Sequence, residues 1–457
     1  MPETLAGTLE QYDTSDRIQD AQVTESGENQ VVQSPLRRVL GNFALLARGR
    51  GIAAVLSLGT TALMARALGP TEFGMLVLMQ TYVLLIRGLL NFKQFQAIIR
   101  YGVPAHDAGD TRTLRRLTLI CRRLDNRSII VATVLALVMA PLVGPMMGMD
   151  HDRVILLALF SLVLLTAGNI TDIGVLRLYD QFDILGRKET IDPFFRFFGV
   201  VIAWWLAAPF AVYIAILAVA YIAENLYLSW CGRREYRRRV GPAPAGEDNG
   251  DARMDEFIGL RHFLGVTYWQ SNIDLIPKHI SVIMAGYLLG AADAGLLRLA
   301  RQFSSLLAKP AILIRQVIFL DLTRSWNQGS TDFKRIAYWT ALIGGGVGLL
   351  FVVTGYFFGG ALLGSLIGEE FIPAAPVLTL LLLAASFELT ASSLRSAAYA
   401  MGHASKVLRL SVLSAVIYLT LFTLLTFELG LIGAGVASCV AAIVPPFAMA
   451  ILIRRGR

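Results

Sequence analysis

Long apolar runs alternate with short polar segments along most of this chain of 457 residues. A helix needs roughly 20 apolar residues to cross the ~30 Å hydrocarbon core of a bilayer. Twelve runs after Asn42 approach that length. They lie near residues 44–66, 74–92, 128–149, 153–176, 191–208, 209–230, 262–288, 294–320, 336–360, 372–394, 409–427 and 430–453. The pattern predicts an all-α integral membrane protein with about 12 transmembrane helices.

The composition agrees with a membrane protein and excludes several other classes. Hydrophobic residues make up 55% of the chain and charged residues only 16%, whereas an ordinary soluble domain has about 25% charged residues. An ordinary soluble enzyme is therefore excluded. The three cysteines, Cys121, Cys231 and Cys439, are too few for a disulfide framework.

Basic residues are distributed unequally between alternate connections, and this predicts the orientation in the membrane. Of 41 Lys and Arg, 32 fall in the segments on one side of the predicted helices, and only Arg66 and Arg153 fall on the other. Connections rich in Lys and Arg stay in the cytoplasm. We therefore expect both termini to be cytoplasmic, and a membrane-impermeant thiol reagent to reach Cys121 and Cys231 only after lysis.

Two polar stretches indicate how the chain is divided. Residues 1–35 contain seven acids and one base, which is typical of a disordered tail, and they lack the basic and apolar regions of a signal peptide. Between the sixth and seventh runs, Pro242, Pro244 and a cluster of arginines indicate a linker. The predicted divisions are an acidic cytoplasmic tail at 1–37, a six-helix half at 38–231, a cytoplasmic linker at 232–260 and a second six-helix half at 261–457.

The two predicted halves resemble each other. The segments Leu68–Gly74 and Leu289–Gly295 both begin with Leu-Gly, carry an acid in fifth place and end in Gly, at an offset of 221 residues. A second match, at an offset of 216, relates Gly186 to Gly402. Because six spans is an even number, the second half re-enters the membrane in the same orientation as the first. We therefore predict two parallel six-helix repeats around a central cavity, with one half rocking against the other during transport.

Motifs for catalysis are missing from the sequence. The chain has no G-x-x-x-x-G-K-[ST] loop and no H-E-x-x-H motif among its five histidines. The connections on the poorly basic side are too short for the external loops that carry catalytic residues in many membrane glycosyltransferases. The sequence predicts a transporter rather than an enzyme, with no catalytic residue, no metal site, no cofactor and no nucleic-acid partner.

Basic residues inside the predicted helices are the candidate substrate-binding residues. A charge at the centre of a bilayer costs ~2.5–3.5 kcal/mol even on a lenient scale, so such residues usually face a wet cavity or a partner. The predicted cations of the cavity are Arg50, Arg87, Lys278, Arg298 and Arg301. All belong to the first two helices of each half, where equivalent positions can line one lumen. A cationic lumen implies an anionic substrate.

Other interpretations of these cations stay open. Arg50 and Arg298 can instead extend toward the nearest lipid headgroups. Lys278 can form a structural pair with Asp274, four residues earlier on the same helix. Arg87 is the hardest to explain in this way, because it lies roughly 20 Å along its helix, past the middle of the membrane.

Four acids are candidates for coupling or gating. They are Asp274, Asp172, Glu388 and Glu224. The last three lie near helix ends and can simply be solvated. Alternatively, Asp172 and Glu388, which the offset of 216 makes equivalent, form symmetric latches to basic groups such as Arg177 and Arg395. The energy source for coupling would be an H⁺ gradient, a Na⁺ gradient or the membrane potential.

Three segments resemble a known family. The run from Ala65 to Gly74, after an arginine-bearing first helix, looks like the opening of Wzx-type polysaccharide flippases of the multidrug/oligosaccharidyl-lipid/polysaccharide (MOP) exporter superfamily. Residues 271–300 are similar to the seventh and eighth helices of that family. Val317–Arg324 resembles the usual exit of helix eight, but Leu320 stands where a proline is common.

The resemblance covers about residues 38–457 and implies a function. It implies that the chain moves an undecaprenyl-diphosphate-linked oligosaccharide across the bacterial inner membrane, for export of O-antigen, capsule or exopolysaccharide. Membrane lipids and other polysaccharide-assembly membrane proteins would be further partners. The alternatives are a multidrug/cation antiporter of the same superfamily, a peptidoglycan lipid flippase and a membrane glycosyltransferase.

Overall fold

The computed structural model describes residues 35–241, 252–305 and 332–455, with side chains from Gly51 onward except at a few positions such as Asp274. Every regular element in these ranges is a helix. The elements are α2 (Pro35–Leu89), α3 (Gln94–Asp107), α4 (Thr111–Met146), α5 (His151–Ser161), η1 (Leu162–Thr166), α6 (Ile170–Leu178), α7 (Phe182–Trp205), α8 (Phe210–Val240), η3 (Met254–Glu256), α9 (Leu260–Leu289), a helical segment at residues 291–305, α11 (Asp332–Leu366), η4 (Glu369–Ala374), α12 (Ala375–Ala400), α13 (Ala404–Leu429) and α14 (Leu431–Arg455).

The all-helical membrane architecture is confirmed. The twelve predicted runs fall largely on helical backbone; the fourth is interrupted at residues 167–169, and the eighth can be followed as far as Ser305. Among the described residues, eight segments are long and apolar enough to span a membrane. The first of them, Gly51–Asp107, contains most of the first predicted span, 44–66, and all of the second, 74–92. The acidic tail at residues 1–34 lies outside the described residues.

Gly69 divides the long helix α2 into two spans. Its backbone has φ 69° and ψ 174°, and Pro70 follows it. This positive φ suits glycine because a Cβ atom would clash with the backbone. Gly290, its counterpart in the predicted repeat, has φ 95° and ψ 174°. The backbone therefore supports the match at an offset of 221.

The backbone does not support the second predicted match, which relates Gly186 to Gly402 at an offset of 216. Gly402 lies in a turn with φ 77°, whereas Gly186 lies inside α7. In the first half, the turn between α6 and α7 has its positive φ at Asp180, at 54°. The prediction that Gly186 and Gly402 are equivalent is therefore wrong, because α7 begins at Phe182 rather than near residue 191.

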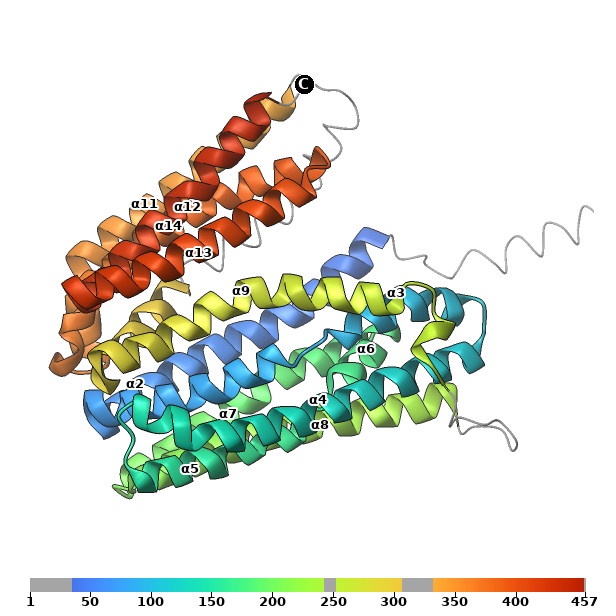
Figure 1. Ribbon diagram of the computed structural model, residues 1–457, viewed down its shortest axis with the longest axis horizontal. Helices are drawn as coiled ribbons and strands as arrows, with labels where there is room; N and C mark the ends of the chain where they lie inside the picture. Colours follow the sequence, from blue (N-terminus) through green and yellow to red (C-terminus); the bar gives the residue numbers. More distant parts are fainter. Residues whose placement is uncertain (1–34, 242–251, 306–331, 456–457) are drawn as a thin grey trace, which may run out of the picture.

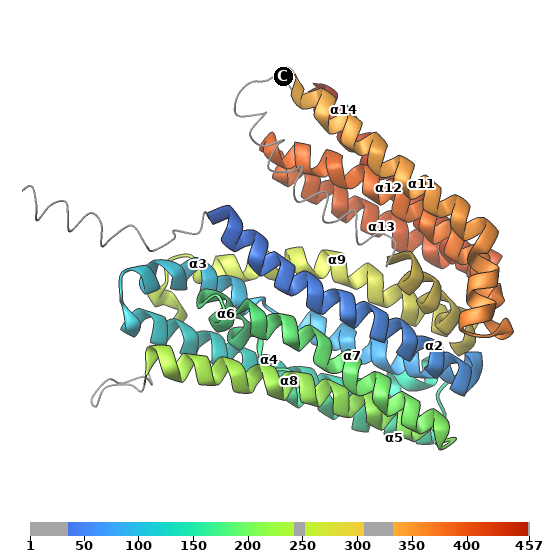
Figure 2. The ribbon, with the colours of Figure 1, turned by 180° about the vertical axis from the view of Figure 1, so that it is seen from behind.

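The helices form two bundles with α9 between them. Helices α2–α8 pack together as the N-terminal bundle. The C-terminal bundle comprises α11–α14 and the segment 291–305, which is hydrogen-bonded to α12 through Ser304 and to α13 through Arg301. Helix α9 contacts α2 on one side and α13 on the other. The bend inside α2 and the connections from α4 to α5, from α11 to α12 and from α13 to α14 lie at one end, here called the hairpin end. The opposite end, where α8 stops and α9 begins, is called the linker end. Figures 1 and 2 show the bundles meeting at the hairpin end and diverging toward the linker end.

Close contacts join the two bundles at the hairpin end. An ideal Cβ on Gly74 would lie 1.8 Å from the carbonyl oxygen of Ala291, and one on Gly295 would lie 2.9 Å from the Cα of Gly74. Glycine is required here because the two backbones touch. Nearby, the guanidinium of Arg66 donates hydrogen bonds to the carbonyl oxygens of Ile367, at 3.1 Å, and of Ser365 at the end of α11.

The linker end attaches the start of α9 to the N-terminal bundle. The hydroxyl of Tyr101 donates to the carbonyl of Ile258 at 3.2 Å, and Arg116 pairs with Glu256 at 2.6 Å. The amide of Arg253 and the guanidinium of Arg116 hold the pKa of Glu256 below its ordinary value. Consequently the first turns of α9 are held by the N-terminal bundle, not only by the second half of the chain.

Two expectations about this end need correction. Helix α8 continues to Val240, so the first nine residues of the linker predicted at 232–260 are helical. Cys121 and Cys231 are buried, with 0% and 7% of their surface exposed. A thiol reagent would therefore fail to reach them even after lysis, because neighbouring helices cover both sulfur atoms.

Candidate functional site

A polar cavity lies where the N-terminal bundle faces the helical segment 291–305. It contains about 560 Å³ of empty space, part of it open to solvent. We call it the inter-bundle cavity. Its polar lining residues are Ser57, Thr60, Thr61 and Gln80 from α2, Asp192 and Arg196 from α7, and Arg298 and Gln302 from residues 291–305.

Gln302 connects the two walls of this cavity. Its side-chain amide donates to the hydroxyl of Thr61 at 3.0 Å, and it approaches the carbonyl and hydroxyl oxygens of Ser57 at 3.5 Å. Thr61 in turn donates to the carbonyl oxygen of Ser57, one helical turn earlier. These neutral groups form a hydrogen-bonded contact between α2 and the segment 291–305. The charged residues Asp192, Arg196 and Arg298 line another part of the cavity.

Two arginines from the two walls provide the positive charge. Arg298, which the sequence predicted, lines the cavity opposite Arg196, and the two guanidinium groups are close enough for their charges to repel each other. Arg196 also pairs with Asp192 at 2.8 Å. Sequence reasoning placed Arg196 in the connection 177–196, because it put the start of the fifth helix too late. The spacing of Asp192 and Arg196, four residues apart, was the available signal for a helix there.

Arg301 has a different position from the one predicted. Its guanidinium donates to the carbonyl oxygen of Lys278 at 3.0 Å, to the hydroxyl of Ser281 at 2.7 Å and to the hydroxyl of Tyr418. It therefore ties the segment 291–305 to α9 and α13, and it is not among the residues that line the inter-bundle cavity. Lys278 is exposed and lies close enough to Arg298 and Arg301 for their positive charges to interact.

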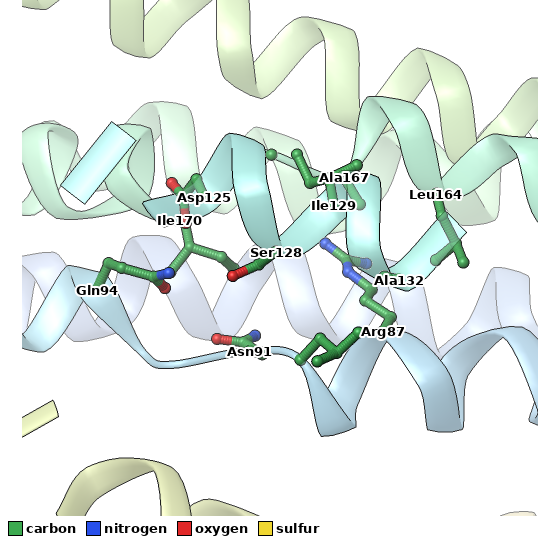
Figure 3. A pocket seen from close by; sticks show the side chains of 12 residues that line it. Arg87, Asn91, Gln94, Asp125, Ser128, Ile129, Ala132, Leu164, Ala167 and Ile170 are labelled. Carbon is green, nitrogen blue, oxygen red and sulfur yellow. The ribbon is translucent and has the colours of Figure 1, made fainter. Parts of the chain in front are cut away.

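Arg87 points into another pocket, which is lined by residues of the N-terminal bundle (Figure 3). It donates weakly to the side-chain oxygen of Asn225 at 3.4 Å, and its guanidinium lies 5.1 Å from the ring centroid of Tyr221. The structure thus does not bring Arg87 together with Arg298. We call this second space the N-bundle pocket; its polar lining residues are Arg87, Asn91, Gln94, Asp125 and Ser128.

Two of the four acids predicted for gating have ion-pair partners within the N-terminal bundle. Asp172 is 1% exposed and pairs with Arg122 of α4 at 2.8 Å. Glu224 pairs with Lys188 of α7 at 2.6 Å. The guanidinium of Arg177, the suggested latch partner of Asp172, lies 4.5 Å from the ring centroid of Phe95. The proposed pairing of Asp172 with Arg177 is therefore replaced by the pair with Arg122, which holds α6 against α4.

For the remaining predicted residues, Glu388, Arg50 and Asp274, the structure gives little or no evidence of a role in the site. Glu388 is exposed on α12, whereas its predicted counterpart Asp172 is buried. The structure does not describe the side chains of Arg50 and Asp274. Within the described ranges, no group of three or more His, Cys, Asp or Glu is arranged to hold a metal ion.

Comparison with known proteins gives concordant results. A family model described as "Polysaccharide biosynthesis protein" matches residues 39–319, more than half of the chain. The chain is 25% identical over 344 residues to the inner membrane protein YghQ of Escherichia coli. This alignment covers 74% of this chain and 95% of that protein.

Solved structures share the fold at low sequence identity. The lipid II flippase MurJ in an inward closed conformation matches with a TM-score of 0.72 and 11% identity, over 90% of this chain and 87% of that one. A mutant of VcmN, a MATE transporter of Vibrio cholerae, matches with a TM-score of 0.63 and 14% identity, over 92% and 96%. An inward-facing multidrug resistance MATE transporter of the MOP superfamily matches with a TM-score of 0.64 and 15% identity, over 88% and 94%. The fold is that of the MOP superfamily, which has about twelve transmembrane helices in two repeats.

Proposed function

Because the chain belongs to the family of polysaccharide biosynthesis proteins, a family of transporters and not of enzymes, we propose that it flips a polyprenyl-diphosphate-linked oligosaccharide across the bacterial inner membrane. The lipid in bacteria would be undecaprenyl diphosphate, and the product would serve an O-antigen, capsule or exopolysaccharide. The likeness to an inner membrane protein of Escherichia coli supports this location. The excess of basic residues at the linker end supports a cytoplasmic position for that end and for both termini.

The pair Arg196 and Arg298 is the observation that carries this proposal. The two guanidinium groups face one cavity from separate helices, and Asp192 neutralises only one of the two charges. An arginine binds phosphate oxygens through two parallel N–H groups, so two arginines can hold the two phosphates of a diphosphate. The neutral side chains of Ser57 and Gln80 line the same cavity and can donate to sugar hydroxyls and to bridging oxygens.

The arrangement of the bundles suggests how the substrate moves. The bundles touch at the hairpin end through Gly74 and Gly295 and diverge toward the linker end. In this state the diphosphate would enter from the linker end and meet Arg196 and Arg298. The polyprenyl chain stays in the hydrocarbon because transferring each CH₂ group from an apolar phase to water costs about 0.8 kcal/mol. Rocking of the bundles would then open the hairpin end.

The test is transport of a labelled polyprenyl-diphosphate oligosaccharide in proteoliposomes, normalised to the amount of inserted protein. Loss of one charge-assisted hydrogen bond costs ~1.5–3 kcal/mol, so we expect Arg196→Ala and Arg298→Ala each to lower transport by roughly ten- to a hundredfold. Arg196→Lys and Arg298→Lys should retain part of the activity, because the charge stays while the planar fork is lost.

Arg187→Ala is the matched control. It lies on the same helix as Arg196, is 72% exposed and pairs only with Asp183 at 3.4 Å among its described contacts, so transport should stay at the wild-type rate. The proposal fails if both Arg196→Ala and Arg298→Ala transport the substrate normally. It also fails if the wild-type protein moves cationic drugs while leaving the labelled diphosphate lipid on its original side.

A further inference from the structure

Three charged residues alternate in sign along one face of α7. Lys188, Asp192 and Arg196 follow one another at intervals of four residues, so their side chains lie one above another, about 6 Å apart along the helix. Asp192 and Arg196 line the inter-bundle cavity, whereas Lys188 is not among the residues that line it. Asp192 therefore has a cation on either side, one at the cavity and one a helical turn nearer the start of α7.

The ion pair at the cavity is close but poorly aligned. The Nε atom of Arg196 lies 2.8 Å from the Oδ1 atom of Asp192. Both atoms are shielded from solvent, yet among the described residues neither has a hydrogen-bond partner. Buried polar atoms nearly always have such a partner. An anion that enters the cavity can therefore offer Arg196 better hydrogen bonds than Asp192 does.

A second ion pair lies next to the first, between α7 and α8. Lys188 pairs with Glu224 of α8 at 2.6 Å. The charges of both residues reach Asp192, which Glu224 repels and Lys188 attracts. The side chains of the four groups are between 16% and 23% exposed, so water screens their charges only in part. Two carboxylates thus compete for Lys188, and Arg196 is an alternative partner for Asp192.

We propose that Asp192 is a positioning residue that competes with the diphosphate for Arg196 and turns to Lys188 while the substrate is bound. The inference deepens the proposed function and rests on it. Without substrate, Asp192 neutralises Arg196. When the diphosphate binds across Arg196 and Arg298, its oxygens replace the carboxylate on Arg196, and Asp192 turns one helical step along α7. We call this movement the exchange.

The exchange gives a cavity with two arginines a way to release its substrate. A site on a transport path must bind strongly enough to load and weakly enough to unload. Asp192 is held four residues from Arg196 on the same helix, so its carboxylate returns at a high effective concentration. Glu224 opposes permanent capture of Asp192 by Lys188, because the two carboxylates repel each other. The four groups together therefore set the affinity of the cavity for the diphosphate.

Transport kinetics of the full chain in proteoliposomes test the exchange, with a labelled polyprenyl-diphosphate oligosaccharide as the probe. In Asp192→Asn the competitor is removed, so we expect KM to fall by about fivefold, the top of the range for a partly exposed ion pair. The value of kcat should fall too, because release becomes slower. A merely structural role would reduce the amount of active protein, and with it kcat, without lowering KM. An unchanged or higher KM in Asp192→Asn overturns the proposal.

Lys188→Gln should act in the opposite direction. Asp192 then has no second partner when the substrate binds, so KM should rise by roughly threefold. In the double variant Asp192→Asn/Lys188→Gln, KM should equal that of Asp192→Asn, because Lys188 acts only through Asp192. An equal rise of KM with and without Asp192 would show that Lys188 attracts the diphosphate directly, and the exchange would be wrong.

Two further variants control for folding and for a general effect of charge. Asp192→Ser removes the same charge with a smaller side chain and takes the place of Asp192→Asn if that variant does not insert; its KM should fall likewise. Asp183→Asn is the matched control, because Asp183 pairs with Arg187 on the same helix at the same spacing, at 3.4 Å, with 43% of its side chain exposed. Its KM and kcat should stay at the wild-type values. A fall of KM in Asp183→Asn as large as in Asp192→Asn would overturn the proposal.

The same measurements separate this inference from the proposed function. If the wild type moves no diphosphate lipid, the proposed function fails and the exchange fails with it. If the wild type moves the lipid and Arg196→Ala impairs transport while Asp192→Asn leaves KM unchanged, only the exchange fails.

Discussion

The two bundles differ in how they accommodate polar groups inside a membrane. The N-terminal bundle contains the ion pairs Arg122–Asp172, Lys188–Glu224 and Arg196–Asp192, and its fourth span is interrupted between Thr166 and Ile170. In the C-terminal bundle, the corresponding α12 runs without interruption from Ala375 to Ala400. A charge or a broken helix within a bilayer requires partners for its polar groups. The N-terminal bundle supplies such partners and can therefore carry the chemistry of transport.

One acid from each bundle shows the difference. Asp172 is buried against Arg122, whereas Glu388 is exposed on the unbroken helix α12. The two acids therefore have different surroundings. The prediction that they are equivalent loses its support, because it rested on the same offset as the match of Gly186 with Gly402.

Removal of Arg122 should have the largest effect. Arg122→Ala leaves Asp172 charged and buried, and breaking such a pair costs ~3–5 kcal/mol; the low end applies because the Arg122 side chain is 26% exposed. We expect a large fall in the thermal stability of the solubilised protein. Glu388→Ala in the C-terminal bundle is the comparison and should change stability far less. Equal losses of thermal stability in both variants would show that the two bundles do not differ in their dependence on such charged groups.

Gly74→Ala should have the next largest effect, at the contact between the bundles. Its Cβ would lie 1.8 Å from a backbone carbonyl oxygen that no side-chain rotation can move away. Overpacking of this kind costs ~1–3 kcal/mol and occasionally more, so both stability and transport should fall. Gly346→Ala is the control, because a Cβ on Gly346 of α11 meets no atom within 4 Å. Wild-type stability of Gly74→Ala would mean that the bundles do not touch there.

Arg66→Ala should have the smallest effect on stability and a clearer one on conformation. Its hydrogen bonds to the carbonyls of Ile367 and Ser365 reach from α2 to α11, and exposure reduces their contribution to about 1 kcal/mol. Phe371, which packs edge to face with Phe73 and is 2% exposed, offers a reporter. We expect a cysteine introduced by Phe371→Cys to react faster with maleimide when Arg66→Ala is present. Equal rates would show that Arg66 does not hold this end closed.

The predicted cations illustrate the limits of sequence reasoning. Arg298 lines the inter-bundle cavity as expected, whereas Arg301, one turn later, binds α9 and α13, and Arg87 faces the interior of its own bundle. Arg196 completes the cavity although its position in the sequence resembled a polar connection. All four have the same charge, so charge alone does not distinguish their roles.

The sequence by itself determined the features that depend on local free energies. Transfer of a 20-residue apolar helix into lipid depends on that helix alone, so the class of protein and the path of the spans follow from composition. The positive φ of Gly69 and Gly290 likewise depends on the absence of a Cβ in each turn. Which way an arginine faces depends on the rotation of its helix about its axis. That rotation is decided by partners such as Asn225 for Arg87 and Tyr418 for Arg301, each more than a hundred residues away, and only the packed structure brings them together.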